Sequence, residues 1–114
     1  MTQDLIANLE RLLAEGKDAA SLRFALASRY LAAGDAAAAV RHAEAAVSLD
    51  DQYTAGWKIL GQAQAAAGDR AGAAASYERG IEIADARGDR QAAKEMLVFL
   101  KRLRKEEAAE RPRD

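Results

Sequence analysis

The chain contains one histidine, His42, the residue type best suited to exchanging a proton near neutral pH. A catalytic base also needs an acidic partner and a nucleophile in the same pocket. His42 instead lies between Arg41 and Ala43 in an Ala-rich segment, and the residue 34 positions further on is Ser76. We therefore interpret His42 as a surface or structural residue and expect no catalytic residues.

Two pairs of adjacent carboxylates, Asp50-Asp51 and Glu106-Glu107, have the chemistry to bind a metal ion. Neighbouring residues on a helix point about 100° apart, so neither pair can converge on one ion or one scissile bond. We expect the first pair to cap helices and the second to lie in a solvated last turn. The chain has no Cys and no Gly-rich phosphate-binding loop. We expect no metal, no cofactor and no enzymatic activity.

The strongest local charge is basic and lies near the C-terminus, where residues 101–105 read Lys-Arg-Leu-Arg-Lys. Residues 86–105 contain seven basic and two acidic side chains, a charge that would attract an acidic partner or a nucleic acid. Lys and Arg are also common near helix C-termini, where they offset the helix dipole. No aromatic residue lies within the basic run, and acidic residues follow it at once. Nucleic-acid binding is therefore the less favoured interpretation, kept as an alternative.

The composition indicates that helices position these residues. The chain has 30 Ala, only nine Val, Ile and Thr in total, and a single Pro at position 112, which predicts an all-α fold. Its 17 basic and 18 acidic residues leave a net charge of −1, whereas disorder goes with high net charge. A length of 114 residues corresponds to one domain.

The sequence also bears on location. No apolar stretch approaches the roughly 20 residues that span a bilayer. The N-terminus lacks the basic start and apolar segment of a signal peptide. We expect a cytoplasmic protein with no membrane partner.

Gly-Asp pairs divide the chain into helices. Gly34-Asp35, Gly68-Asp69 and Gly88-Asp89 each combine a residue that ends a helix with one that caps the next. Gly16 and Asp18 form a looser version of the same signal. The resulting prediction is six helices over residues 3–15, 19–33, 36–49, 53–67, 70–87 and 90–109, followed by a polar, frayed tail over residues 110–114.

The first two Gly-Asp pairs are 34 residues apart, and the surrounding sequence repeats with that period. Aligning residues 20–51 with 54–85 pairs identical residues other than Ala at five positions: Leu26/Leu60, Gly34/Gly68, Asp35/Asp69, Glu44/Glu78 and Asp51/Asp85. A helix-turn-helix unit repeated every 34 residues is typical of a helical solenoid.

The residues within these units resemble the tetratricopeptide repeat family. The second unit has the family's Trp-Leu-Gly pattern, followed by its small and aromatic positions: Trp57, Leu60, Gly61, Ala73, Tyr77 and Gly80. The first unit matches with Arg23, Leu26, Ala27, Tyr30, Ala39, Ala43 and Ala46. The sequence departs from the pattern with Arg23 in place of Trp, Gln64 in place of Tyr, and Asp51 and Asp85 in place of the usual Pro.

The resemblance implies an all-α, right-handed superhelix within a single domain of residues 1–109, like small bacterial proteins of this family. Two helix pairs, about 20–53 and 54–87, would lie between capping helices at about 3–15 and 90–109. Trp57 would be largely buried. Met96, Leu97, Leu100 and Leu103 would cover the open end of the second unit.

The resemblance also implies a non-catalytic protein-interaction module that binds a peptide or protein in a concave groove. Carried over by position, the candidate partner-binding residues are Phe24, Ser28, Leu31, Lys58, Gln62 and Lys94. Phe24 has an alternative assignment, as a core residue packed against the N-terminal helix. A second possible function is self-association as a homodimer through Val98 and Phe99, which lie off the apolar stripe of the last helix.

Overall fold

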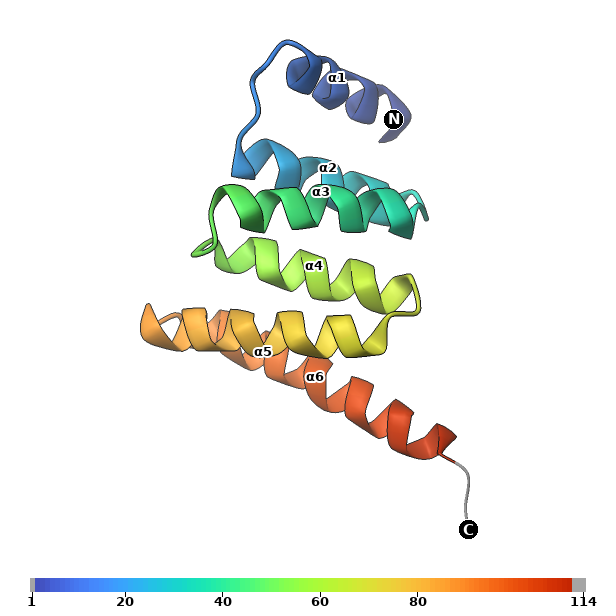
Figure 1. The fold of residues 1–114 in the computed structure, drawn as a ribbon, viewed down its shortest axis with the longest axis vertical. Coiled ribbons are helices and arrows are strands. Elements are labelled where there is room, and N and C mark those ends of the chain that lie inside the picture. Colours follow the sequence, from blue (N-terminus) through green and yellow to red (C-terminus); the bar gives the residue numbers. More distant parts are fainter. Residues whose placement is uncertain (1, 112–114) are drawn as a thin grey trace.

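The computed structural model describes residues 2–111 and contains, within them, six α-helices and no β-strand (Figure 1). Every predicted helix is present, and each end lies within one residue of its predicted position. The helices are α1 (Thr2–Ala14), α2 (Ala20–Ala32), α3 (Ala36–Leu49), α4 (Thr54–Ala66), α5 (Arg70–Ala86) and α6 (Arg90–Glu110).

The Gly-Asp pairs act as the sequence predicts. The carboxylates of Asp35, Asp69 and Asp89 accept hydrogen bonds of 2.9–3.1 Å from backbone N–H groups in the first turns of α3, α5 and α6. Gly34 and Gly68 precede two of these caps with φ near +86°, a conformation that side chains disfavour. These turns reverse the chain between antiparallel helices.

Two carboxylates predicted to cap helices do not cap a helix N-terminus, although Asp50 is the C-cap residue of α3 and its backbone N–H donates to the Ala46 carbonyl oxygen at 3.0 Å. Asp18 forms a two-pronged ion pair with Arg23, with N···O distances of 2.8 and 3.0 Å, and the residue that precedes α2 has no side-chain cap. The Asp50 carboxylate accepts the backbone N–H of Gln52 at 3.0 Å, and the residue that precedes α4 is Tyr53. Both carboxylates have a nearby donor that competes with the helix N-terminus, so neither carboxylate caps the start of a helix.

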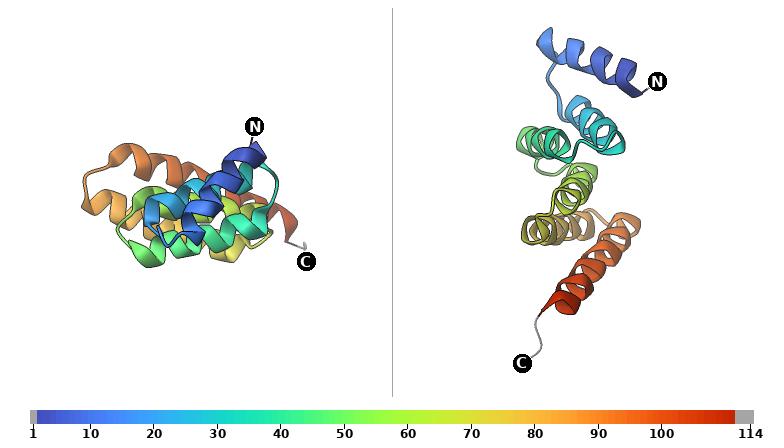
Figure 2. Two further views of the ribbon diagram at one scale, coloured as in Figure 1. Left: turned by 90° about the horizontal axis from the view of Figure 1, so that it is seen from above. Right: turned by 90° about the vertical axis from the view of Figure 1, so that its right-hand side faces the viewer.

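The helices stack into a superhelix with two rows. α2, α4 and α6 form one row, and α3 and α5 form the other, as the right-hand view of Figure 2 shows. α4 contacts α2, α3, α5 and α6, whereas α1 packs against α2 at one end and α6 packs against α4 and α5 at the other. The two terminal helices thus cover the ends of the repeated pairs, as predicted.

Two hydrophobic clusters hold the stack together. One joins the first pair to the second through Ala27, Ala43, Val47, Ile59 and Leu60. The other joins α5 to α6 through Ala73, Tyr77, Ala84, Met96, Leu100 and Leu103. Gly61 allows Tyr77 to lie against the α4 backbone, because a Cβ atom there would come within 2.5 Å of the Tyr77 ring. Small residues thus permit the close helix spacing that an Ala-rich core requires.

Trp57 is partly buried and packs on the first of these clusters, and its indole N–H donates to the Asp51 carbonyl oxygen at 2.8 Å. Two further expectations need correction. Leu97 is 40% exposed and lies outside the buried stripe of α6. Glu110 is the last residue of α6 rather than part of a frayed tail, and its carboxylate pairs with Arg70. Arg111 follows α6 as its C-cap residue, and residues 112–114 of the predicted tail lie outside the described residues.

No helix among residues 2–111 has the length and apolar character to cross a membrane.

Candidate functional site

Four of the six predicted groove residues lie together. Phe24 and Ser28 of α2 face Lys58 and Gln62 of α4 across a hollow of about 220 Å³, which Ala55 and Ile59 complete. Within each pair the residues are four apart and therefore lie on one face of their helix. The 34-residue period then sets the two pairs side by side.

The other two predicted residues are placed differently. Leu31 is half-buried and packs on the cluster that joins the two helix pairs. Lys94 is exposed on α6 and is not among the residues that line this hollow. Neither Leu31 nor Lys94 therefore lines the hollow between α2 and α4.

Phe24 lines the hollow and also packs on the core, where its partners are Tyr53 and the inter-pair cluster rather than the N-terminal helix of the alternative assignment. Its ring lies edge-on to that of Tyr53, with centroids 5.6 Å apart, and packs on the inter-pair cluster. The same side chain lines the hollow. Phe24 is thus both a support of the core and part of the floor of the groove.

Lys58 links the groove to the last helix. Its Nζ atom lies 3.2 Å from Oε1 of Glu95, so an ion pair joins α4 to α6. Both side chains are partly exposed, and pairs of this kind add little to stability in water. The lysine therefore remains accessible to an acidic ligand that competes with Glu95.

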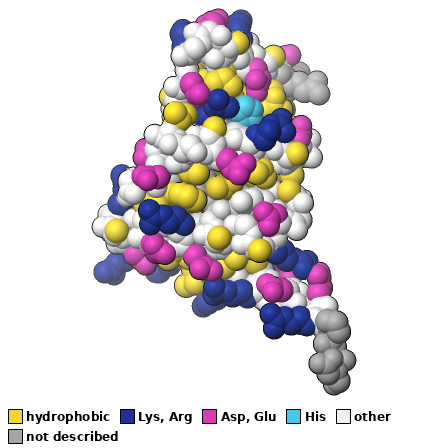
Figure 3. All heavy atoms as spheres, in the orientation of Figure 1, with side chains coloured by type: hydrophobic (Ala, Val, Ile, Leu, Met, Phe, Trp, Pro, Cys, Tyr) yellow, Lys and Arg dark blue, Asp and Glu magenta, His cyan; other side chains and the backbone are white. Residues whose placement is uncertain are grey.

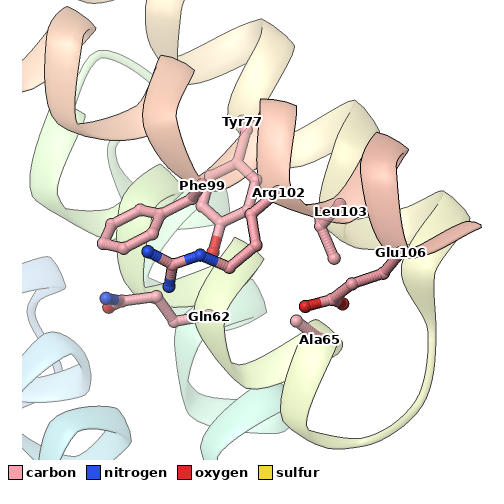
Figure 4. Close-up of a pocket in the computed structure, with 7 residues that line it drawn as sticks. All are labelled: Gln62, Ala65, Tyr77, Phe99, Arg102, Leu103 and Glu106. Carbon is pink, nitrogen blue, oxygen red and sulfur yellow. The ribbon is translucent and has the colours of Figure 1, made fainter.

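A second hollow continues the groove toward α6. Its volume is about 190 Å³, and its lining residues are Gln62, Ala65, Tyr77, Phe99, Arg102, Leu103 and Glu106 (Figure 4). Gln62 lines both hollows. Together the two hollows form one groove across α2, α4 and α6.

Aromatic rings and a guanidinium group define the chemistry of this second hollow. The Tyr77 and Phe99 rings lie 5.7 Å apart, and the Arg102 guanidinium lies 5.9 Å from the centre of the Phe99 ring. In Figure 4 the guanidinium extends beside Phe99 toward Gln62. Burial raises the pKa of Tyr77 to about 12, so its hydroxyl stays protonated and neutral.

Sequence reasoning missed Phe99, Arg102 and Tyr77 as groove residues. The period that places α2 and α4 fails at α6, because α5 is 17 residues long and α3 is 14. The sequence pattern instead predicts that Phe99, with Val98, takes part in self-association. The sequence feature that could identify Phe99 as a groove residue is its position on α6, beside rather than within the buried stripe of Met96, Leu100 and Leu103.

His42 lies in a polar cluster that ties α1 to the first helix pair. Its Nε2 atom lies 3.1 Å from Oε1 of Glu10 in α1, and its Nδ1 atom lies 3.1 Å from Nη1 of Arg23 in α2. Tyr30 stacks on the imidazole with centroids 5.4 Å apart and donates its hydroxyl to Glu10 at 3.1 Å. Figure 3 shows the histidine between charged neighbours on the face where α3 lies in front.

These contacts define the protonation state of His42. A guanidinium only donates, so the imidazole Nδ1 atom must accept from Arg23, and the proton lies on Nε2 and is donated to Glu10. Burial, together with Arg23 and Arg41, lowers the pKa of His42, whereas Glu10 opposes the shift. His42 is therefore a neutral structural residue, in agreement with the sequence interpretation.

This cluster predicts that acidification weakens the fold. Because the folded pKa of His42 lies below its ordinary value near 6.5, the unfolded chain takes up a proton first as the pH falls. The free energy of unfolding should fall with decreasing pH between about 6.5 and the folded pKa, by at most about 1.4 kcal/mol per pH unit. Urea titrations from pH 8 to pH 5 measure this dependence.

The matched control for the pH dependence is His42→Gln, which keeps a polar side chain but cannot titrate. Subtracting its pH profile removes the contribution of the carboxylates. If the two profiles run parallel between pH 6.5 and pH 5, His42 does not carry the effect.

Within residues 2–111 no group of three or more His, Cys, Asp or Glu residues is arranged to hold a metal ion. The groove offers an aromatic floor, an amide, two cations and the Glu106 carboxylate, which are groups that can contact a peptide segment.

The stacked helix pairs, the caps at both ends and the groove along one row define a helical-repeat protein. The chain is 52% identical over 99 residues to a tetratricopeptide repeat-containing protein of Pseudomonas aeruginosa, which covers 87% of this chain and 94% of that protein. This chain belongs to the tetratricopeptide repeat family. No protein-family model matches it.

Solved structures agree with this assignment. A protein of Bordetella parapertussis, solved in solution, superposes with a TM-score of 0.79 at 43% identity and covers 92% of this chain and 91% of its own. The tetratricopeptide repeat domain of Sgt2 from Aspergillus fumigatus superposes with a TM-score of 0.82 at 30% identity, covering 99% of this chain and 76% of its own. Domains of this fold generally mediate protein–protein interactions and are generally non-enzymatic.

Proposed function

We propose that this protein is a non-catalytic interaction module whose groove, across α2, α4 and α6, binds a segment of a protein partner. The observation that carries the proposal is the meeting of two hollows at Gln62, which gives one surface contributed by three helices. Residues 1–109 act as a single domain in this proposal. The cytoplasmic location expected from the sequence remains a prediction.

The groove chemistry specifies the kind of segment that fits. Phe24 and Phe99 offer apolar contact at the two hollows, and the Lys58 and Arg102 cations lie beside them. Gln62 between them can donate to and accept from a peptide backbone. We expect a segment with apolar side chains and at least one carboxylate, bound in the groove.

Binding of a nucleic acid, the alternative that the basic run of the last helix suggests, is less favoured for this groove. Glu95 beside Lys58 and Glu106 near Arg102 bring negative charge to the groove, which a phosphate backbone would meet at close range. A short protein segment can place its carboxylates only at the cations. The groove therefore suits a protein better than a nucleic acid.

The test is loss of partner binding in groove variants that keep the fold. Gln62→Trp fills the junction of the two hollows, and Arg102→Glu reverses the charge beside Phe99. Each should weaken binding of a captured and purified partner at least about tenfold, which is about 1.4 kcal/mol. Isothermal titration calorimetry measures the affinity, and thermal melts confirm that the fold is kept.

The matched control is Arg41→Glu, since Arg41 is an exposed arginine on α3, outside the groove. It should bind the partner as the unmodified chain does. Unchanged affinity in both groove variants would rule out the groove as the binding surface.

A further inference from the structure

The outward face of α6 carries a row of cations. Arg90, Lys94, Leu97, Lys101 and Lys105 are three or four residues apart and therefore share one face of the helix, and all five are exposed. Within residues 2–111 none of these four cations forms an ion pair. The buried residues Met96, Leu100 and Leu103 lie on a different face.

An acidic row lies beside it on α5. Glu78, Glu82 and Asp85 are spaced by four and three residues, and all three are exposed. Glu82 also lies 3.3 Å from Arg79 of the same helix, in an exposed pair of the kind that contributes little and that a partner's cation can replace. The ion pair between Glu78 and Arg104, at 3.1 Å, shows that the acidic row and the α6 surface adjoin. Figure 3 shows side chains of both signs gathered over the end of the molecule where α5 and α6 lie.

Apolar side chains accompany these charges. Leu97 is 40% exposed within the basic row, and Val98 next to it is 54% exposed. A cap whose only task is to keep the end of a repeat stack in water has no need of them. Exposed apolar side chains bordered by charged ones are typical of the centre and rim of an interface.

We propose that this end face binds a second copy of the chain, forming a two-fold dimer through α5 and α6. In a two-fold interface the same patch meets itself, so the basic row of α6 lies on the acidic row of the partner's α5, and the reverse holds at the same time. Leu97 within the basic row and Val98 at its edge supply apolar contact.

The two adjoining rows favour this partner over others. A nucleic acid or an anionic membrane laid across the face would meet Glu78, Glu82 and Asp85 and be repelled. A purely acidic helix would match α6 but leave α5 unmatched. A second copy matches both rows, because it carries the complement of each.

Sedimentation velocity of the full chain over a range of protein concentrations tests the proposal. At about 50 mM salt we expect a concentration-dependent dimer, and at about 0.5 M salt a shift toward monomer, because exposed charges are screened. Sedimentation as a monomer at every concentration in low salt, up to millimolar protein, overturns the proposal.

Charge reversal tests which rows meet. Lys101→Glu with Lys105→Glu places acid opposite acid, and Glu82→Lys with Asp85→Lys places base opposite base. Each double variant should weaken the dimer about 100-fold or more, because like-charge contacts cost several kcal/mol. An equimolar mixture of the two variants should restore a dimer, since each row again faces its opposite.

Two controls accompany the charge-reversal variants. Lys17→Glu with Arg41→Glu reverses two exposed cations away from the end face and should leave the dimer unchanged. Circular dichroism melts verify that each variant is folded. A mixture that stays monomeric, or a dimer that survives both reversals, rules out the α5–α6 pairing.

Discussion

Deletion of residues 90–114 is expected to abolish cooperative folding. α6 buries Met96 completely and Leu100 and Leu103 nearly so against the second helix pair. Without it, Tyr77 and Ala84 face water across an apolar surface. A terminal repeat without its cap exposes a hydrophobic face and tends to aggregate.

Differential scanning calorimetry with size-exclusion chromatography measures this effect. The truncated chain should show no cooperative transition and should elute as aggregate. The matched control ends at Arg111 and lacks only residues 112–114, and it should melt as the full chain does. A monomeric truncation at residue 89 with a sharp melting transition would contradict the proposed role of α6.

Tyr77→Ala is expected to be the most damaging single substitution in the second helix pair. The side chain is 2% exposed and lies between Gly61 of α4 and the α6 cluster, so truncation opens a cavity that neighbours cannot fill. Loss of a buried aromatic side chain costs about 3–5 kcal/mol, a large share of a small domain's stability.

The informative comparison is with Trp57→Ala. Trp57 is the larger side chain, but it is half-buried, so its loss should cost less than that of Tyr77. Tyr77→Phe is the conservative control, which keeps the ring and should cost little. Urea unfolding gives the three free-energy changes, and a larger loss for Trp57→Ala than for Tyr77→Ala would show that burial has been misjudged.

The sequence predicts the helices well because their signals are local. Asp35, Asp69 and Asp89 cap helices through contacts three residues away, and a Gly before each ends the preceding helix. The same types at Asp18 and Asp50 mislead, because each has a different nearby donor. Residue type alone does not distinguish a cap from an ion pair or a turn.

The sequence predicts only those groove residues that the 34-residue repeat relates to one another. Phe24, Ser28, Lys58 and Gln62 were predictable because one period relates α2 to α4. Phe99 and Arg102 were not, because the longer α5 shifts α6 out of that period. Lys94 shows the error that results, since it lies on the outward face of α6.

Long-range contacts account for the remaining differences. Leu97 fits the apolar pattern of α6, but the helix turns it toward water because Met96 and Leu100 already fill the contact with α5. The His42 cluster joins α1, α2 and α3 through residues up to 32 positions apart. A pattern of residues close together in the sequence cannot predict contacts between residues so far apart.

The most direct test of groove binding is a chemical-shift map. The ¹⁵N-labelled protein is titrated with the purified binding segment of a captured partner, and amide shifts are followed residue by residue. The groove account predicts that the largest shifts fall on α2, α4 and α6 around Ser28, Gln62 and Arg102, and that α3 changes little. Shifts concentrated on α3, or on the outward face of α6 with the groove unaffected, would contradict it.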